Sequence, residues 1–377
     1  MPEGRSIAPR TLKLALCGDV MIGRGVDQML PHPCDPILYE DYAGSAVEYV
    51  ALAERVCGPI ARPVDVAYPW GDALEELARA QPDARIVNLE TAITRSGDAW
   101  PGKGIHYRVS PENAAVLSAA RIDVCALANN HVLDWGRSGL AETVATLDGL
   151  GIRHAGAGRD ASEAEAPAVV DLAPRGRLLV FAFASTSSGV PAAWAAAKSR
   201  AGVALLPDLS LSSVDRVAQR IAEARREGDC VVASIHWGDN WGFAVSDEER
   251  RFARALVERG GVDVVHGHSS HHVKGIEVHR GRPILYGCGD LLDDYEGISG
   301  YEEFRGDLGL VYLVTLDAAL RELLALEMVP TRVERLRVRR ASSAEVEWLA
   351  STLSREGQRF GTSVARAAEG HLVLRWG

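Results

Sequence analysis

Short apolar runs alternate with amphipathic segments through the first two thirds of the chain. Each run is four to seven residues long and rich in Val, Ile, Leu and Ala, which is typical of buried strands. The strands that this pattern predicts are 12–17, 85–89, 122–128, 169–172, 178–183, 230–235 and 262–265.

The segments between these runs have apolar residues spaced by three and four positions, which predicts helices. The expected helices are 73–80, one beginning at Pro111, 136–150, 212–227 and 246–259. The last begins with a capping box, because Glu249 follows Ser246 by three residues. Strands and helices in alternation predict an α/β fold with a largely parallel sheet.

The pattern becomes richer in strands after Val273. Strands are expected at 275–279, 283–287, 308–316, 328–340 (one or two strands) and 372–374, with a helix at 343–354. Residues 31–70 hold six of the 17 prolines and one expected helix, 45–56. This insertion is either a surface embellishment or a cover for a substrate. We therefore expect one domain over 1–377, with a core of about 12–316 and a C-terminal extension over 317–377.

Composition narrows the class of protein. A net charge of −10 over 377 residues argues against nucleic acid as a partner. No apolar stretch reaches the roughly 18 to 20 residues of a membrane span, and residues 1–10 lack the apolar core of a secretory signal. The six cysteines form no CxxC pair, which favours buried, reduced thiols in a cytoplasmic protein. The oligomeric state stays open.

Polar residues that can bind metal follow the apolar runs. In an open α/β sheet the carboxyl ends of the strands border the ligand-binding crevice. Carboxylate, amide and imidazole groups that meet there are suitable ligands for a pair of divalent cations. We expect the following six residues to end strands of one sheet and to bind metal: Asp19, Glu90, Asn130, His236, His268 and His271.

Each position also has a structural explanation when it is taken alone. Asp19, Glu90 and Asn130 could cap helices or turns. His236, alone at the end of a strand, is more often structural than metal-binding. Four histidines within 266–272, however, are hard to explain by packing.

A histidine beside the expected metal site suggests acid–base chemistry. His131 follows Asn130, and Asp134 lies close enough in the sequence to orient its imidazole. A carboxylate behind a histidine fixes its tautomer and raises its basicity. No GxSxG elbow, P-loop or complete dinucleotide fingerprint is present.

Five motifs together resemble the CapA family, named for poly-γ-glutamate capsule synthesis, within the calcineurin-like metallophosphoesterase superfamily. The motifs are Gly18-Asp19-Val20-Met21-Ile22-Gly23-Arg24, Asn88-Leu89-Glu90-Thr91, Ala128-Asn129-Asn130-His131-Val132-Leu133-Asp134, Ile235-His236-Trp237-Gly238 and Gly267-His268-Ser269-Ser270-His271. The resemblance implies a four-layer αββα sandwich with mixed sheets flanked by helices. It also implies two divalent metal ions (Mn, Fe, Zn or Mg) on the six residues, with His131 as an acid oriented by Asp134.

Two positions depart from the family pattern. Met21 replaces the histidine of the aspartate-any-histidine pair of ordinary metallophosphoesterases, which argues against phosphoester hydrolysis. Asp290 stands where CapA members usually carry asparagine.

The resemblance leaves three functions open. Soluble CapA-like proteins resemble peptide-tailoring enzymes, including epimerases of lasso peptides. The leading hypothesis is a soluble metal-dependent enzyme that acts on a peptide or γ-glutamyl carboxylate, most sharply by epimerisation at the Cα of a C-terminal residue. Candidate acids and bases are His131, His271, His272 and Asp290. The alternatives are a metal-dependent phosphoesterase and a non-catalytic accessory protein of poly-γ-glutamate or peptide-maturation machinery.

Overall fold

The computed structural model of this chain describes residues 11–377. The expectation that residues 1–10 carry no secretory signal therefore lies outside the described residues. Across 11–377, no helix has both the length and the apolar character needed to cross a bilayer. All six cysteines are free thiols, five of them buried and Cys57 half-buried.

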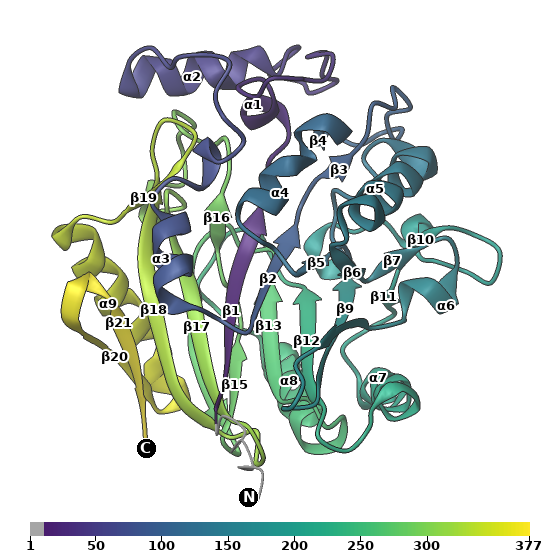
Figure 1. Ribbon diagram of the computed structural model, residues 1–377, viewed down its shortest axis with the longest axis vertical. Helices are drawn as coiled ribbons and strands as arrows, with labels where there is room; N and C mark the ends of the chain where they lie inside the picture. The colour runs from purple at the N-terminus through teal and green to yellow at the C-terminus, as the bar shows by residue number, and fades with distance from the viewer. Residues whose placement is uncertain (1–10) are drawn as a thin grey trace, which may run out of the picture.

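Two large β-sheets form the centre of the described fold (Figure 1). Within residues 11–377, the first sheet has ten strands: β1 (Thr11–Val20), β2 (Ala84–Leu89), β5 (Val124–Ala126), β6 (Arg153–Ala155), β16 (Asp290–Leu292), β17 (Leu308–Asp317), β18 (Leu323–Val333), β19 (Val338–Arg340), β20 (Thr362–Arg366) and β21 (Leu372–Trp376). The second has seven: β8 (Ala168–Asp171), β9 (Arg177–Ser185), β11 (Leu205–Leu206), β12 (Cys230–His236), β13 (Val264–His268), β14 (Ile276–His279) and β15 (Arg282–Leu285). Two short pairs complete the strands: β3 (Ala92–Ile93) with β4 (Arg108–Val109), and β7 (Ala157–Gly158) with β10 (Gly202–Val203).

Both sheets are mixed rather than largely parallel. Strands β1, β2, β5 and β6 are parallel neighbours, as are β9, β12, β13 and β15. Strands β17, β18, β21 and β20, from the strand-rich C-terminal part of the chain, extend the first sheet in antiparallel pairs. The parallel neighbours come from the part of the chain where strands and helices alternate, and the antiparallel ones come mainly from the strand-rich part after Val273, as the change of pattern there predicts.

Alternating side chains in the second sheet bury both of its faces. In β9, Leu179, Phe181 and Phe183 pack in a cluster with residues of helices α7 (Leu211–Ala224) and α8 (Asp247–Arg259). The intervening Val180 and Ala182 belong to a larger cluster that also contains residues of the first sheet. Because side chains alternate across a strand, one face meets the helices and the other meets the first sheet. This arrangement confirms the predicted α/β class with mixed sheets flanked by helices.

The helices agree closely with the hydrophobic pattern. They are α1 (Arg24–Asp27), α2 (Val47–Cys57), α3 (Ala73–Ala80), α4 (Ala115–Ala119), α5 (Gly136–Leu150), α6 (Ala161–Ala164), α7 (Leu211–Ala224), α8 (Asp247–Arg259) and α9 (Ser343–Gly357). The predicted capping box at Ser246 and Glu249 is present at the start of α8. Helix α9 has a second one, between Ser342 and Glu345.

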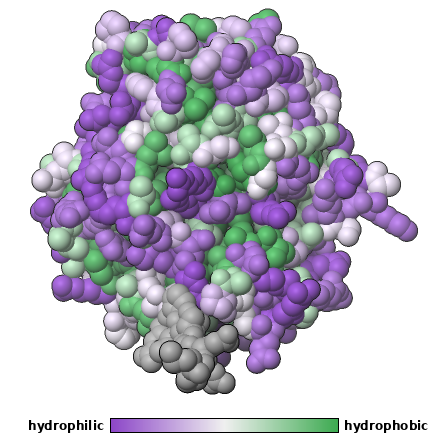
Figure 2. Space-filling view, in the orientation of Figure 1, coloured by the Kyte–Doolittle hydropathy of each residue, from purple (hydrophilic) through white to green (hydrophobic). Residues whose placement is uncertain are grey.

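The insertion at 31–70 lies at one end of the sheets. In Figure 1 its helix α2 lies at the top, beyond the upper ends of β1 and β16. The face in Figure 2 is mostly hydrophilic, with hydrophobic residues in short patches. Several large hydrophobic side chains of the insertion are nevertheless exposed, among them Tyr39, Tyr42 and Val56.

Candidate metal centre

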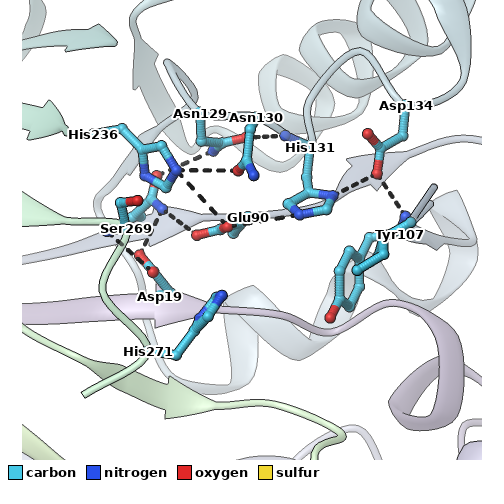
Figure 3. Close-up of polar contacts among 12 residues, drawn as sticks. Asp19, Glu90, Tyr107, Asn129, Asn130, His131, Asp134, His236, Ser269 and His271 are labelled. Atoms are coloured by element: carbon cyan, nitrogen blue, oxygen red, sulfur yellow. Dashed lines mark hydrogen bonds and ion pairs between the residues drawn. The ribbon is translucent and has the colours of Figure 1, made fainter. Parts of the chain in front are cut away.

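The six predicted ligands converge at the edge where the carboxyl ends of both sheets meet, and Figure 3 labels all of them except His268. Asp19 lies in β1, and Glu90 and Asn130 follow β2 and β5 of the first sheet. The three histidines end or follow β12 and β13 of the second sheet. The prediction that all six end strands of one sheet is therefore wrong, because two sheets packed face to face share this edge.

The alternation of side chains along β12 and β13 places the histidines on the face that meets the first sheet. In β12, Val231, Ala233 and Ile235 pack against α7 and α8. Ser234 and His236 alternate with them and so point the other way. The same alternation in β13 directs His266 and His268 inward, and His266 Nε2 lies 2.9 Å from the carbonyl oxygen of Cys17.

A bulge in β1 turns Asp19 toward these histidines. The pairing of β1 with β2 shifts register between Cys17 and Asp19, and a β-bulge re-aims the side chain that follows it. Gly18 permits this arrangement, because a Cβ there would lie 1.8 Å from the carbonyl oxygen of Gly289. The backbone amide of Asp19 donates to that oxygen at 2.9 Å.

Two groups of possible ligands share Asp19. Asp19, His236 and His268 form one group, and Asp19, His271 and Asp290 form the other; within each, the ligand atoms lie within 4.8 Å of one another. All are buried. Asp290 was predicted as an acid–base residue, but its place in the second group suits a ligand equally well.

Glu90 and Asn130 lie beside the first group. Glu90 Oε1 is 3.9 Å from His236 Nε2. The amide oxygen of Asn130 is 3.0 Å from the same nitrogen. The structure therefore brings all six predicted ligands into one buried region.

Asn88, which was not among the residues predicted for the site, holds two of the carboxylates in place. Its side-chain amide donates to Asp19 Oδ1 at 2.7 Å and to Glu90 Oε2 at 3.0 Å. The sequence contained a signal for Asn88, because it precedes Glu90 by two residues and residues two apart in a strand share a face. Asn129 Nδ2 in turn donates to Asn88 Oδ1 at 3.0 Å.

The turn after β13 is strained at the same place. Ser269 has a φ of 107°, which is unusual for a residue other than glycine. Its backbone amide donates to Asp19 Oδ2 at 3.3 Å. Strain of this kind often occurs at functional sites, where neighbouring contacts hold it in place.

The donor set fits divalent cations. Burial, with the nearby Asp290 carboxylate, raises the pKa of Asp19 to about 7. Burial also raises the pKa of Glu90 and of Asp290 well above the usual range and lowers that of His236 and His268. Asp290 Oδ2 is buried without a hydrogen-bond partner among the described residues. Cations bound here would compensate the repulsion between buried carboxylates and use neutral imidazoles as ligands.

His131 lies next to the ligands and is oriented by Asp134. Its Nδ1 lies 2.7 Å from Asp134 Oδ2, so we assign the ring proton to Nδ1, which donates to the carboxylate. Nε2 then faces Glu90, with Oε1 at 3.8 Å. Lys103 Nζ lies 2.8 Å from Asp134 Oδ1. Burial lowers the pKa of His131, which keeps the imidazole neutral and able to accept a proton.

His272 has a different environment from the other candidates. Its Nδ1 lies 3.0 Å from the carbonyl oxygen of Val273, and its Nε2 accepts from the amide of Gly242 at 3.1 Å. Its ring stacks on Phe304. Both nitrogens are thus engaged within the protein, which favours a packing role over proton transfer.

A cavity of about 910 Å³ opens beside the centre. His271, Asp293 and Tyr295 line its inner end, and residues of α2, including Tyr49, line another part. Tyr295 Oη is 3.4 Å from His271 Nε2 and accepts from Tyr107 Oη at 3.1 Å. Neither tyrosine was predicted for the site, because both lie in irregular segments with no periodic signal.

Comparisons with known proteins identify relatives of this chain. Residues 13–295 match the family model described as Bacterial capsule synthesis protein PGA_cap. A Mycobacterium tuberculosis (strain H37Rv) protein named "Probable polyglutamine synthesis accessory protein" is 49% identical over 357 residues, which is 94% of each chain. The "PGA biosynthesis protein CapA" of Bacillus subtilis is 26% identical over 294 residues, which is 78% of this chain and 66% of that protein. A crystal structure of a phosphatase from Mycoplasma pneumoniae has a TM-score of 0.47 at 10% identity, and covers 85% of this chain and 93% of that one.

This chain belongs to the PGA_cap family, and the predicted resemblance to CapA proteins is confirmed. The matched residues 13–295 include every member of both ligand groups.

Because several carboxyls of the site are buried, we expect an unusual pH dependence of the stability of the metal-free protein. We expect the free energy of unfolding to fall as the pH rises from about 6.5 to 8, by about 1.4 kcal/mol per pH unit for each carboxyl that keeps its proton only when folded. The raised pKa of Asp19, at about 7, means that up to about that pH the folded state holds a proton which the unfolded chain has already released, so Asp19 contributes in the lower part of this window. The buried histidines, whose pKa is lowered, make the free energy of unfolding rise with pH. They do so only below the ordinary histidine pKa of about 6.5, where the unfolded chain binds protons that the folded state does not.

Urea unfolding in the presence of a chelator, at three pH values across that window, measures this slope. Asp19→Asn should show a smaller slope than the unmodified protein, because it removes one of the protonated groups. A stability that is constant or rises from pH 6.5 to 8 would contradict the expectation.

Proposed function

We propose that this protein is a divalent-metal-dependent enzyme that acts on the carboxylate of a peptide or γ-glutamyl substrate. The observation that supports it most is the pair of buried ligand groups joined at Asp19. The names of two relatives, which refer to polyglutamine synthesis and to PGA biosynthesis, favour a glutamyl substrate. The cavity beside the centre is large enough for a small peptide.

Asp19, His236 and His268 would hold one cation, with Glu90 and Asn130 beside them, and Asp19, His271 and Asp290 would hold the other. Bound cations would coordinate the substrate carboxylate and stabilise the negative charge that develops when the α-proton leaves. Asn88 orients two of the carboxylates through its amide.

Epimerisation at Cα is the sharpest form of the proposal. Neutral His131 accepts the α-proton at Nε2, and Asp134 stabilises the imidazolium that results. A second group must return a proton to the opposite face of the carbon. Tyr295 is a candidate, since its hydroxyl lies beside His271 at the inner end of the cavity. Transfer of its phenolic proton to Cα leaves a phenolate, which His131 reprotonates through solvent.

Solvent exchange tests this chemistry directly. The protein is incubated with Mn²⁺ and γ-L-glutamyl-L-glutamate in D₂O, and mass spectrometry and NMR then measure deuterium at Cα. We expect incorporation, slowed about 10²- to 10⁴-fold in His131→Gln, which removes the proton acceptor. His154→Gln, at a histidine of β6 outside the ligand groups, is the matched control. No incorporation in any glutamyl or C-terminal peptide tested would reject epimerisation, and phosphate release from p-nitrophenyl phosphate would favour hydrolysis instead.

A non-catalytic accessory role is the second candidate, and the name of the 49% identical relative favours it. In that case the ligand groups take no part in turnover. Purified protein that retains no Mn²⁺ after dialysis, and that shows no exchange activity, would support the accessory role over the enzyme.

A further inference from the structure

One buried carboxylate at the inner end of the cavity has no partner on its free oxygen. Asp293 is 1% exposed and lines the cavity. Its Oδ1 accepts from the backbone amide of Tyr295 at 2.8 Å. Its Oδ2 is buried and has no hydrogen-bond partner within 11–377. A buried carboxylate oxygen in that state is costly unless a ligand satisfies it.

The neighbouring acids have other roles. Asp294 accepts from the guanidinium of Arg24 and from the amide of Gly25. Asp290 contacts His271 at 3.0 Å through Oδ1 and belongs to the second ligand group, although its Oδ2 also lacks a hydrogen-bond partner among residues 11–377. Asp293 belongs to neither ligand group. Burial, with Asp290 nearby, raises the pKa of Asp293, so the site favours the arrival of positive charge.

The cavity walls suit a cation rather than a second anion. The rings of Trp241 and Tyr301 stack with centroids 4.2 Å apart, and both residues line the cavity. Aromatic faces attract ammonium groups. Four arginines also line the cavity, but three of them are already in ion pairs with acids of the protein: Arg24, Arg305 and Arg332. The fourth, Arg55, is exposed on α2.

We propose that Asp293 binds the ammonium group of a substrate whose carboxylate lies at the neighbouring metal centre. This inference rests on the proposed function and narrows its substrate class to molecules that carry a free amino group near the reacting carboxylate. The amino-terminal residue of a γ-linked glutamyl chain carries such an amino group, because the γ-linkage leaves both its α-amino and its α-carboxylate groups free. The C-terminal residue of an ordinary peptide has no free amino group beside its carboxylate, because its α-nitrogen is part of an amide.

Calorimetry on the Mn²⁺-loaded protein tests the inference with two probes, γ-L-glutamyl-L-glutamate and its N-acetyl derivative. The free amine should bind about tenfold to hundredfold more tightly, as expected for a hydrogen bond between charged groups. Asp293→Asn should abolish that preference and leave the affinity for the acetylated probe unchanged. Glu303→Gln, which removes an exposed carboxylate that does not line the cavity, should keep the preference.

Metal content is measured on each variant in parallel, so that a change in substrate binding is separated from a loss of metal. Equal binding of both probes by the unmodified protein would overturn the role of Asp293 without any variant, and would leave the metal-dependent function standing. Loss of Mn²⁺ from Asp293→Asn would overturn it in favour of a metal ligand. If neither probe binds a protein that holds Mn²⁺, the glutamyl substrate class itself fails, and the role of Asp293 fails with it.

Discussion

Asp19→Asn protein should lose metal from both ligand groups at once. Asp19 is the member that the two groups share, so one substitution removes a carboxylate from each. Changes in residues that only support metal ligands already cost about 10- to 100-fold in affinity, and loss of a shared ligand should cost at least as much. Mass spectrometric metal analysis after dialysis against metal-free buffer measures the effect.

Single-group variants provide the comparison for this experiment. His268→Asn and Asp290→Asn each alter one group, so each should release metal from that group and keep more than Asp19→Asn does. Asp239→Asn, the same change at an exposed residue, should bind metal as the unmodified protein does. Full retention of Mn²⁺ by Asp19→Asn would remove the main support for a binuclear centre.

Arg24→Met should destabilise the protein by about 3–5 kcal/mol, since it breaks a buried ion pair and leaves its partners charged. The guanidinium pairs with Asp294 and Glu40, and both side chains are buried. It also donates to the hydroxyls of Tyr49 and Tyr107. Arg24 has a φ of 44°, a left-handed conformation that these contacts hold in place.

Urea unfolding measures the loss. Arg159→Met is the matched control, because Arg159 pairs with Glu163 while its own side chain is 83% exposed, and exposed pairs contribute at most about 1 kcal/mol. The double variant Arg24→Met/Asp294→Asn should recover part of the stability, since the unpaired carboxylate is then neutral. If Arg24→Met unfolds no more readily than Arg159→Met, the buried cluster does not stabilise the fold as we infer.

Arg24 also shows why some contacts could not be predicted. It lies in the first family motif, yet its partners come from the insertion, from the residue just before β4 and from the segment after β16. These contacts join residues up to 270 positions apart. No periodicity in the sequence connects them, because they form only when the insertion folds over the end of the first sheet.

Hydrophobic periodicity and polar residues at strand ends are local features, so the amino-acid sequence predicted the longer strands, the main helices and the six ligand candidates. Short strands such as β6 and β7 have no such signal. The helix at Gly136–Leu150 and the capping box at Ser246 follow from neighbouring residues alone. Local pattern could not show that the ligands come from two sheets, since the parallel runs of both sheets look alike along the chain.

Which polar residues act together depends on how the two sheets and the insertion pack. It placed Asp290 with Asp19 and His271, engaged both ring nitrogens of His272, and left Asp293 unpaired at the cavity. The physical reason is that burial and packing between sheets determine which charges remain uncompensated, and neither can be read from the order of residues.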